Sequence, residues 1–464
     1  MEKWAASELK QADLGDARRN KRLVRIVEDL AAQPSSSVPQ ACGNIAATSA
    51  AYDFWNSPYF QPQDIRSPHI ASTIERIKEN DIILAIQDTT SIDLTDHPAT
   101  SGVGYLDHRK LSGLKVHSTF TTTTHGVPLG IINQQVWARE QENLGIAKKR
   151  RQRETEEKES QRWLDSLNTT QQLIPEEITV VTMGDSEADI FDLFSLERRE
   201  NSHLLIRGTH NRKVDHNAKY LHQAIRQTEP CGTLTVEVKR NPERDARTAK
   251  LTLFQATFEI QVPLHHIRRL QLKPVKLQVI LALEENPPDG IKPISWLLLT
   301  TLKANSFEEA ARCVRWYTYR WLIERYHYTL KSGCGIEKLQ LETARRIDMA
   351  LATYSIVAWR LLWLTYEARF NPDMPCDSVL EIDEWQSLCA TINKNPIPPK
   401  KPPSLREAVR MIAILGGFLG RKGDGEPGVK TIWRSRSVSK RGLQRLHDIA
   451  ATWKLLYQNC QICI

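Results

Sequence analysis

The stretch 178-ITVVTMGDSEADIFDLF-194 decides the fold of this chain. It begins with an apolar run rich in β-branched residues, which is typical of a strand buried on both faces. Gly184 and Asp185 then predict a turn, and the residues after them predict a helix whose first turn Asp185 is suited to cap. A strand, turn and helix in this order indicate an α/β domain built around a sheet.

Other strand patterns lie on both sides of this stretch. Before it come 81-DIILAIQD-88 and two further strand-like runs, at 114–124 and 128–138, joined by a turn signal. After it comes 202-SHLLIRGTH-210. These segments predict three successive strands, then a strand–helix–strand unit, in one mixed sheet. Four more strand patterns between about 211 and 300 predict a β-rich insertion in this α/β core.

The chain divides into three predicted domains. Residues 1–70 are predicted to form a helical DNA-binding domain, residues 71–372 the α/β core with its insertion, and residues 373–464 a helical carboxyl-terminal domain that is expected to dimerise. A proline-rich segment, 393-NKNPIPPKKPPS-404, precedes the last helical region. At 464 residues the chain is long enough for several cores.

The composition favours a polyanionic partner. The formal net charge is +8, and the sequence predicts neither a secretory leader nor an apolar span of about 18 residues.

The helix predicted after Asp16 has an apolar face and carries clustered bases on its other faces, which solvent or DNA phosphates can satisfy. The bases taken as DNA contacts there are Arg18, Arg19 and Arg22. The run 148-KKRRQR-153 favours solvated surface, and Cys460 with Cys463 favours reduced thiols over a zinc site.

Two acids stand at the ends of apolar runs. Asp88 follows ILAIQ, and Asp185 follows TVVTMG. Since ligands gather beyond the strand ends of α/β sheets, the two carboxylates can converge on one point. Each is equally open to an ordinary interpretation as a cap or turn acid.

The segment 317-YTYRWLIERYHYTLK-331 mixes aromatic and charged residues. With about 100° per residue, Tyr317, Arg320, Glu324 and Lys331 fall in one stripe roughly 60° wide on a helix. The opposite side gathers core residues, so the segment predicts one amphipathic helix. Its predicted core face is Tyr319, Leu322, Ile323, Tyr326 and Leu330. Arg320 and Glu324 also have the spacing of a plain helix-surface ion pair.

The pattern Y-x2-R-x3-E-x6-K resembles the YREK signature of bacterial insertion-sequence transposases of the Asp-Asp-Glu class. The resemblance extends to AIQDTTS around Asp88, GDSEADI around Asp185, IRGTHNRK at 206–213 and SWLLLT around Trp296, in the same order. It covers most of residues 1–370 and implies a ribonuclease-H-like core with Asp88, Asp185 and Glu324 as catalytic triad. Ser186 departs from the motif, since a close relative has a base there, and similarity is weaker at the carboxyl end.

The resemblance also implies a set of DNA contacts. Tyr317, Arg320 and Lys331 match residues that grip a phosphate beside a flipped base, so these bases are expected to hold DNA and not to pair with Glu324. Trp296 matches a tryptophan that stacks on that base. An aromatic residue in SWLLLT is as well explained by core packing. Further contacts are expected in the 206–213 segment, at Arg207, His210, Arg212 and Lys213.

The chemistry of three carboxylates suits hard cations. Mg²⁺ or Mn²⁺ is the expected cofactor, with two ions about 4 Å apart stabilising the attacking and leaving oxygens at phosphorus. The resemblance implies a cut-and-paste DNA transposase that nicks element ends, forms and reopens a hairpin, and joins the 3′-hydroxyl to target DNA. The implied partners are double-stranded DNA, as inverted-repeat ends and target, and a second copy of the chain. The implied location is the bacterial cytoplasm, at the nucleoid.

Two alternatives remain at this point. A ribonuclease-H-like nuclease without strand transfer would use the same carboxylates. A non-catalytic DNA-binding inhibitor of transposition would share the basic regions, but would have less need for three intact acids.

Overall fold

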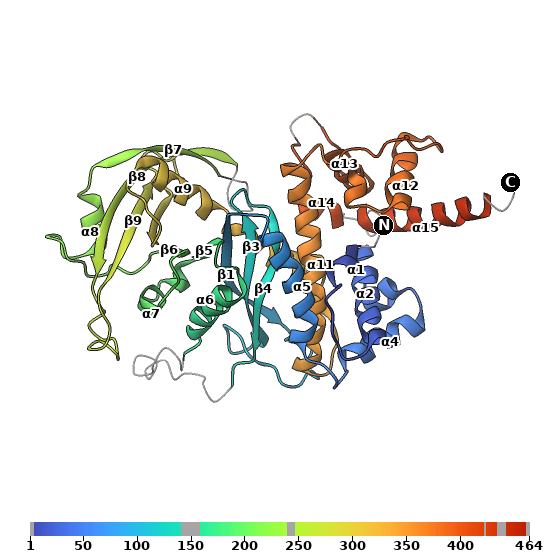
Figure 1. Ribbon diagram of the computed structural model, residues 1–464, viewed down its shortest axis with the longest axis horizontal. Helices are drawn as coiled ribbons and strands as arrows, with labels where there is room; N and C mark the ends of the chain where they lie inside the picture. Colours follow the sequence, from blue (N-terminus) through green and yellow to red (C-terminus); the bar gives the residue numbers. More distant parts are fainter. Residues whose placement is uncertain (1–3, 141–157, 239–245, 422–423, 434–441, 461–464) are drawn as a thin grey trace.

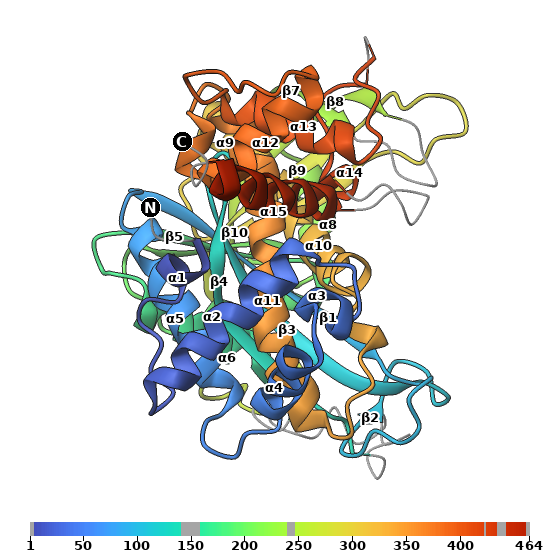
Figure 2. The ribbon, with the colours of Figure 1, turned by 90° about the vertical axis from the view of Figure 1, so that its right-hand side faces the viewer.

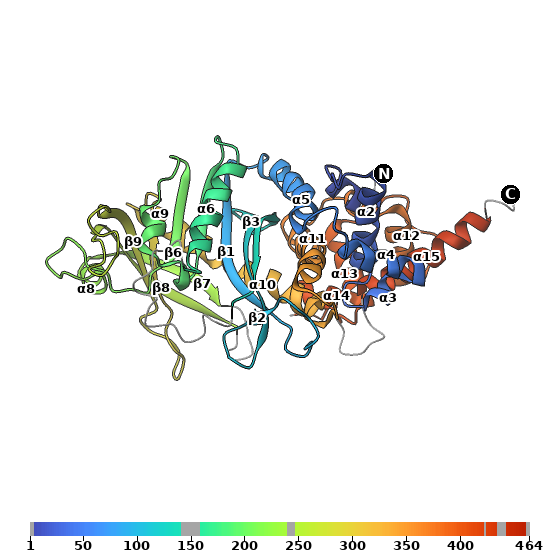
Figure 3. The ribbon, with the colours of Figure 1, turned by 90° about the horizontal axis from the view of Figure 1, so that it is seen from below.

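The computed structural model describes residues 4–140, 158–238, 246–421, 424–433 and 442–460 (Figure 1). A large mixed sheet occupies one half of the molecule, and a bundle of helices from both ends of the chain occupies the other (Figures 1 and 3). The predicted α/β class, with a mixed central sheet between two helical end regions, is confirmed. The segment 148–153 and Cys463 lie outside the described residues, and so does the side chain of Cys460.

The sheet contains ten strands within the described chain, in the order β2-β3-β1-β5-β6-β10-β9-β8-β7, with β4 paired to β3. Strands β1, β3 and β4 form the predicted antiparallel meander, while β1, β5 and β6 run parallel. The strands are β1 Ile82–Asp93, β2 Gly104–Tyr105, β3 Ser112–Thr123, β4 Pro128–Trp137, β5 Thr179–Gly184, β6 Ser202–Arg207, β7 Pro230–Val238, β8 Arg247–Ile260, β9 Val275–Leu283 and β10 Ser295–Thr300.

The β-rich region continues this sheet. Its four strands, β7 to β10, match the four predicted patterns, and β10 pairs antiparallel with β6 of the core. Strand β9 then pairs with β10, and β8 and β7 follow outward. The inserted segment is therefore hydrogen-bonded to the core through β6, the parallel strand next to β5, which Asp185 follows.

Short helices cover the sheet and lead back to the bundle. They are α6 Gln161–Leu173, α7 Phe191–Ser195, α8 Leu221–Arg226, α9 Phe307–Thr318 and α10 Trp321–Tyr328. A 3-10 turn, Ser186–Ala188, connects β5 to α7. Helix α6 buries Trp163, Leu164 and Leu167 and so begins a packed layer directly after the charged segment.

The amino-terminal helices are α1 Trp4–Glu8, α2 Ala17–Ala32, α3 Val38–Cys42, α4 Ile45–Trp55 and α5 Pro62–Ile77. In α2 the predicted core face, Leu23, Ile26, Val27 and Leu30, is buried. Asp16 caps this helix by accepting a hydrogen bond from the Arg18 backbone N–H at 2.8 Å. The sequence prediction for this helix is confirmed.

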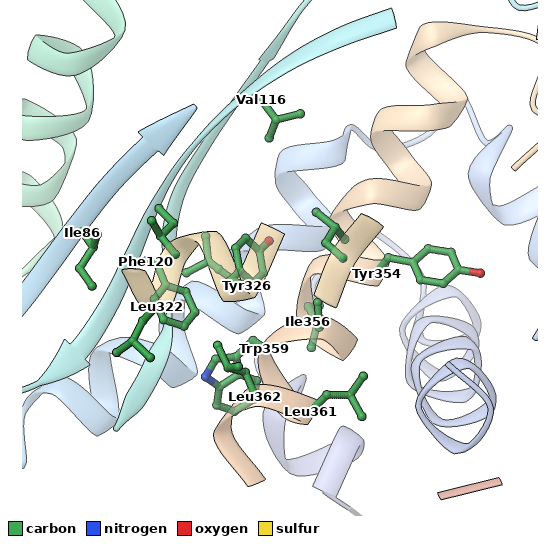
Figure 4. Packing of buried hydrophobic residues seen from close by; sticks show 14 of the residues in the cluster. Ile86, Val116, Phe120, Leu322, Tyr326, Tyr354, Ile356, Trp359, Leu361 and Leu362 are labelled. Carbon is green, nitrogen blue, oxygen red and sulfur yellow. The ribbon is translucent and has the colours of Figure 1, made fainter. Parts of the chain in front are cut away.

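One long helix, α11 Ala344–Phe370, joins the two halves of the molecule (Figure 2). It packs against α2 and α5 on one side and β4 on another, and Tyr354, Ile356 and Trp359 reach into the core shared with the sheet (Figure 4). By length and composition alone α11 is apolar enough to cross a membrane. However, 83% of its most apolar window is buried inside the fold, as expected of a core helix.

The carboxyl-terminal helices form their own small core. Trp385, Leu388, Leu405 and Ile412 are buried there against the end of α11. The helices are α12 Ile382–Asn393, α13 Leu405–Leu415, α14 Val429–Trp433 and α15 Gly442–Cys460. The proline-rich segment separates α12 from α13, as its composition predicts.

The prediction of one continuous helix over 317–331 is wrong. Helix α9 ends at Thr318, α10 begins at Trp321, and a π-helical turn occupies Thr329–Gly333. The backbone N–H groups of residues 319, 320 and 322 each bond to the carbonyl three residues earlier, at 2.9 to 3.0 Å. Because each residue of such a tight turn rotates by about 120° and not by about 100°, the single stripe calculated for a regular helix over 317–331 does not apply. Arg320 and Glu324 still meet as an ion pair four residues apart. Tyr317 turns into the core instead, and Tyr319 is only half-buried.

Candidate active site and DNA-contact residues

The parallel pairing of β1 and β5 brings the two aspartates to the same level. Ile86 is the register partner of Met183, so Asp88 and Asp185 lie level two residues further along the two strands. Strand β5 ends at Gly184, whereas β1 continues to Asp93. Asp88 is therefore not at a strand end, as the sequence suggested; it lies where the neighbouring strand stops and leaves its side open.

Helix α10 brings Glu324 to these aspartates. Leu322 and Tyr326 are fully buried on the other side of the helix, and the Tyr326 ring stacks on Phe120 of β3 at 5.3 Å between centroids (Figure 4). This packing fixes α10 beside β1. Glu324, between the two buried residues in sequence, has a side chain that is 55% exposed.

The electrostatics of Asp88 show that the three acids form one cluster. Burial raises the pKa of Asp88, the charges of Asp185 and Glu324 raise it further, and the total reaches about 7 although Arg320 opposes the shift. The His327 ring lies 3.8 Å from the Asp88 carboxylate, but burial lowers the pKa of His327 to about 3, so that neighbour is uncharged. A carboxylate whose ionisation is opposed first by burial and then by nearby carboxylates is well suited to a cation.

The carboxylates are not in contact with one another. Within the described part of the chain, no group of three His, Cys, Asp or Glu side chains has the spacing of metal ligands. One Asp185 oxygen accepts the Glu187 backbone N–H at 2.8 Å, and Glu324 forms an ion pair with Arg320. The expectation that Arg320 leaves Glu324 unpaired thus does not hold for the protein alone. Carboxylate oxygens are nevertheless the donors that hard divalent cations prefer, so the expected metal stays a prediction.

Arg162 of α6 ties together the two segments that carry the aspartates. Its side chain is 12% exposed; Nε donates to Thr89 Oγ1 and Nη2 to Glu187 Oε2, each at 2.8 Å. The backbone N–H of Thr89 in turn bonds Asp88, as that of Glu187 bonds Asp185. Sequence reasoning missed Arg162, because it ends a charged run that favours solvated surface. The buried Trp163 beside it was the available signal.

A group of aromatic and basic residues borders the acids. Trp296 of β10 is half-buried and its ring meets that of Tyr317 edge-on, 5.8 Å between centroids. Burial raises the pKa of the Tyr317 hydroxyl to about 12, and the nearby Arg320 and Arg207 act against that shift. Four of the predicted DNA contacts are thus brought together. The Tyr317 hydroxyl is buried without a hydrogen-bond partner.

A cavity of about 460 Å³ opens next to this group. Its lining combines two arginines, Arg207 and Arg226, with apolar side chains from α8, β9 and β10. Ser186, directly after Asp185, lines it as well. The cavity is large enough for a single nucleotide, and its charge suits a phosphate.

Arg212 does not face DNA, contrary to the expectation from its motif. It is buried and bonds the fully buried Asp189, with Nε donating to the carboxylate at 3.0 Å. Asp189 also accepts the backbone N–H groups of Thr209 and His210, at 2.8 Å each. The pair fixes the loop after β6, because a buried arginine requires a carboxylate partner.

The other basic candidates are more accessible. His210 and Lys213 are exposed on the loop that Arg212 fixes. Lys331 is partly exposed and pairs with Glu337 at 3.0 Å. These three stay predictions as DNA contacts.

The amino-terminal bases form a second, separate group, on the far side of α11 from the acids (Figure 1). Arg18 and Arg22 are exposed on α2, and Arg18 pairs with Asp16 at 2.9 Å. The Arg19 guanidinium lies 4.1 Å from the centroid of the exposed Tyr59 ring. An exposed arginine–aromatic pair on a basic helix is a suitable surface for nucleic acid.

Two parts of the chain match known protein-family models. Residues 1–59 match the family described as Transposase DNA-binding, and residues 356–441 match the family described as Transposase Tn5 dimerisation domain. Together with the fold, these matches support a protein of the transposase class, with a DNA-binding domain in its amino-terminal helices and a dimerisation domain in its carboxyl-terminal ones. Both matches support a Tn5-like transposase. The three acids lie between the two matched regions.

Proposed function

We propose that this Tn5-like transposase performs cut-and-paste transposition, with Asp88, Asp185 and Glu324 as its catalytic residues. The observation that carries the proposal is the convergence of these three acids, from β1, the end of β5 and α10, at the open side of the sheet. The ribonuclease-H-like character of the core is part of the proposal. The antiparallel β4-β3-β1 meander followed by the parallel β5 and β6 supports it.

The three carboxylates would hold Mg²⁺ or Mn²⁺. Bound there, such ions supply Lewis-acid stabilisation of the oxygens exchanged at phosphorus. Burial and like charge already oppose ionisation of Asp88 in the metal-free protein, and a cation would relieve that opposition.

The surrounding bases would bind the DNA strand. Arg320 is available for a phosphate once Glu324 turns to the aspartates, and its fork suits two phosphate oxygens. Lys331 adds a point charge nearby. Trp296 offers a ring for a displaced base, and Arg207 lines the cavity beside it.

A product assay tests the proposal. Purified protein is incubated with DNA carrying the inverted repeats that flank its own coding region, a target plasmid and Mg²⁺ or Mn²⁺. Joined donor–target products, preceded by a hairpin species at the donor end, are the expected result.

Two other outcomes of the same assay would support the alternative functions, a nuclease or a DNA-binding inhibitor. Cleaved ends that are never joined would identify a nuclease. Specific binding without cleavage, under either metal, would identify a DNA-binding inhibitor and overturn the catalytic proposal.

A further inference from the structure

The connection between β8 and β9 projects from the sheet as a loop with an apolar tip (Figure 1). We call residues 262–273 the finger. Leu264, Ile267 and Leu270 are 61, 52 and 100% exposed, in a chain that otherwise buries most large aliphatic side chains. Three exposed aliphatic residues on one short loop are a marked departure from an ordinary turn.

The finger is held in a defined shape. His266 Nε2 lies 2.9 Å from one oxygen of Asp192, and Arg268 Nη2 donates to the other at 2.8 Å. Backbone hydrogen bonds from His266, Arg269 and Leu272 to carbonyls three or four residues earlier close successive turns. The apolar tip is therefore presented by a braced loop.

Basic residues surround the tip. Arg269, Lys273 and Lys276 are exposed, whereas the charge of Arg268 is met by Asp192. From residue 260 to residue 283 the sequence contains no aspartate or glutamate. An acid-free loop with an apolar tip and flanking bases complements a polyanion that also offers an apolar surface.

The geometry points to duplex DNA as the occupant: we propose that the finger inserts Leu270, supported by Ile267, between base pairs from the minor groove and bends the duplex. Apolar wedges flanked by Lys and Arg are the chemistry by which proteins kink DNA. The amino-terminal family match already makes DNA a partner of this chain. The basic residues would not favour a second copy of this basic chain as the partner. Duplex DNA accounts for both the apolar tip and the basic residues beside it.

Asp192 connects the finger to the part of the chain that carries the proposed catalytic acids. It belongs to α7, which follows the segment carrying Asp185 and Asp189. DNA bent by the finger would be held at a fixed position relative to the catalytic segment. The inference does not rest on the cleavage chemistry, and its tests are run in EDTA.

Bending is measured by energy transfer between dyes at the two ends of a duplex rich in flexible TA steps. Full-length wild-type protein should bring the dyes closer and raise the fluorescence of 2-aminopurine placed at such a step. The variant Ile267→Ser/Leu270→Ser should bind about tenfold more weakly and lose both signals, since without the wedge nothing stabilises the unstacked step. Arg269→Ala/Lys273→Ala should lower the salt dependence of binding by about 2 in slope.

Matched controls come from the exposed proline-rich segment. Ile397→Ser removes an equally exposed aliphatic residue, and Lys400→Ala/Lys401→Ala removes two exposed charges; both should bend DNA as wild type does. Thermal melting confirms that each variant is folded. Bending by Ile267→Ser/Leu270→Ser equal to that of wild type would overturn the proposal.

A photo-crosslinker in place of Leu270 identifies the occupant directly. Adducts to DNA support the proposal. Adducts between two protein chains in the presence of DNA would assign the finger to a protein interface and overturn it. Binding of wild type, but not of Ile267→Ser/Leu270→Ser, to phosphatidylserine vesicles with DNA bending unchanged would assign a membrane surface and overturn it as well.

Discussion

Asp88 is destabilising in the protein without metal. Its side chain is 17% exposed, and burial together with two nearby carboxylates raises its pKa to about 7. The raised pKa means that the folded state binds the Asp88 proton more tightly than the unfolded state. The Asp88 contribution to the unfolding free energy is therefore full below about pH 4 and is lost as the pH rises to about 7.

Asp88→Asn should therefore stabilise the metal-free protein at pH 8 by about 1–4 kcal/mol, the range that a shift of up to about three pKa units allows. Thermal melts of both proteins in EDTA at pH 5 and pH 8 test this. The gain should be larger at pH 8. An equal gain at both pH values would show that ionisation of Asp88 is not opposed by its surroundings.

Arg162 is a positioning residue in this account, because it bonds the neighbours of both aspartates. Arg162→Ala should lower the cleavage rate about 10–100-fold and raise the metal concentration needed for half-maximal rate. Arg162→Lys should recover part of the rate. The matched control is Arg199→Ala, which removes a half-buried arginine bonded to backbone carbonyls at the opposite end of β5. A similar loss in both alanine variants would reduce Arg162 to a general structural role.

Trp296 should affect the rate of hairpin formation, the step that follows the first nick. If its ring holds a displaced base, Trp296→Ala should slow hairpin formation by about tenfold while the first nick proceeds nearly as in wild type. Time courses on end-labelled DNA resolve the two steps. Equal slowing of both would indicate that the ring serves only to pack Tyr317.

Single residues were predictable where a motif contained them. Asp88, Asp185 and Glu324 stand out by position and resemblance, and the structure brings them into one electrostatic cluster. Arg162 and the Arg212–Asp189 pair were not predictable, because a sequence does not show which of many bases will be buried against an acid. Burial of a charge depends on contacts between segments far apart in the chain.

At the scale of elements, a buried ion cluster fixes α1 on α5. The Glu8 carboxylate contacts His69 Nδ1 at 2.6 Å and Arg76 Nη1 at 2.7 Å. Burial alone would raise the pKa of Glu8, but the hydrogen bonds from His69 and Arg76 and the charge of Arg76 outweigh it and bring the pKa to about 2. Burial lowers the pKa of His69, so its ring acts as a neutral hydrogen-bond donor near pH 7. Because this pKa is depressed, the contribution of Glu8 to stability is full above about pH 4.5 and is lost as the pH falls toward 2.

Glu8→Gln should thus cost about 3 kcal/mol near neutral pH, since it removes the only carboxylate that the partly buried Arg76 contacts among the described residues. The difference in melting temperature between wild type and variant should narrow as the pH is lowered below about 4.5. Calorimetric scans at pH 7 and pH 3.5 provide the comparison. A constant difference would mean that Glu8 acts through packing and not through its charge.

Strands were easier to predict than helix breaks. Continuous apolar runs located β1, β5 and β10, because strands buried on both faces have few polar residues. Alternation of apolar and polar residues located β7 and β8, which bury one face. The break between α9 and α10 escaped prediction. An average step of about 100° per residue assumes regular hydrogen bonding, and the tight turn at 319–323 depends on how Tyr317 packs in the core.

At the scale of the whole molecule, α11 separates two groups of DNA-contact candidates. The bases of α2 lie on one side and the acids with their aromatic neighbours on the other (Figures 1 and 3). The order of helical and β-rich regions along the chain was predictable from the sequence, whereas the domain boundaries stay predictions. The continuity of the β-rich region with the central sheet was not, because edge pairing between β6 and β10 leaves no mark in either sequence.

In the proposed function, Asp88, Asp185 and Glu324 act together as one catalytic centre. The most direct test compares cleavage and binding of end DNA by Asp88→Asn, Asp185→Asn and Glu324→Gln with the exposed-surface control Glu75→Gln, in Mg²⁺ and in Mn²⁺. Each of the three is predicted to bind as wild type does and to lose cleavage by at least about 1,000-fold, with no further loss on combining two of them. Cleavage at the wild-type rate by any one of the three would contradict the account.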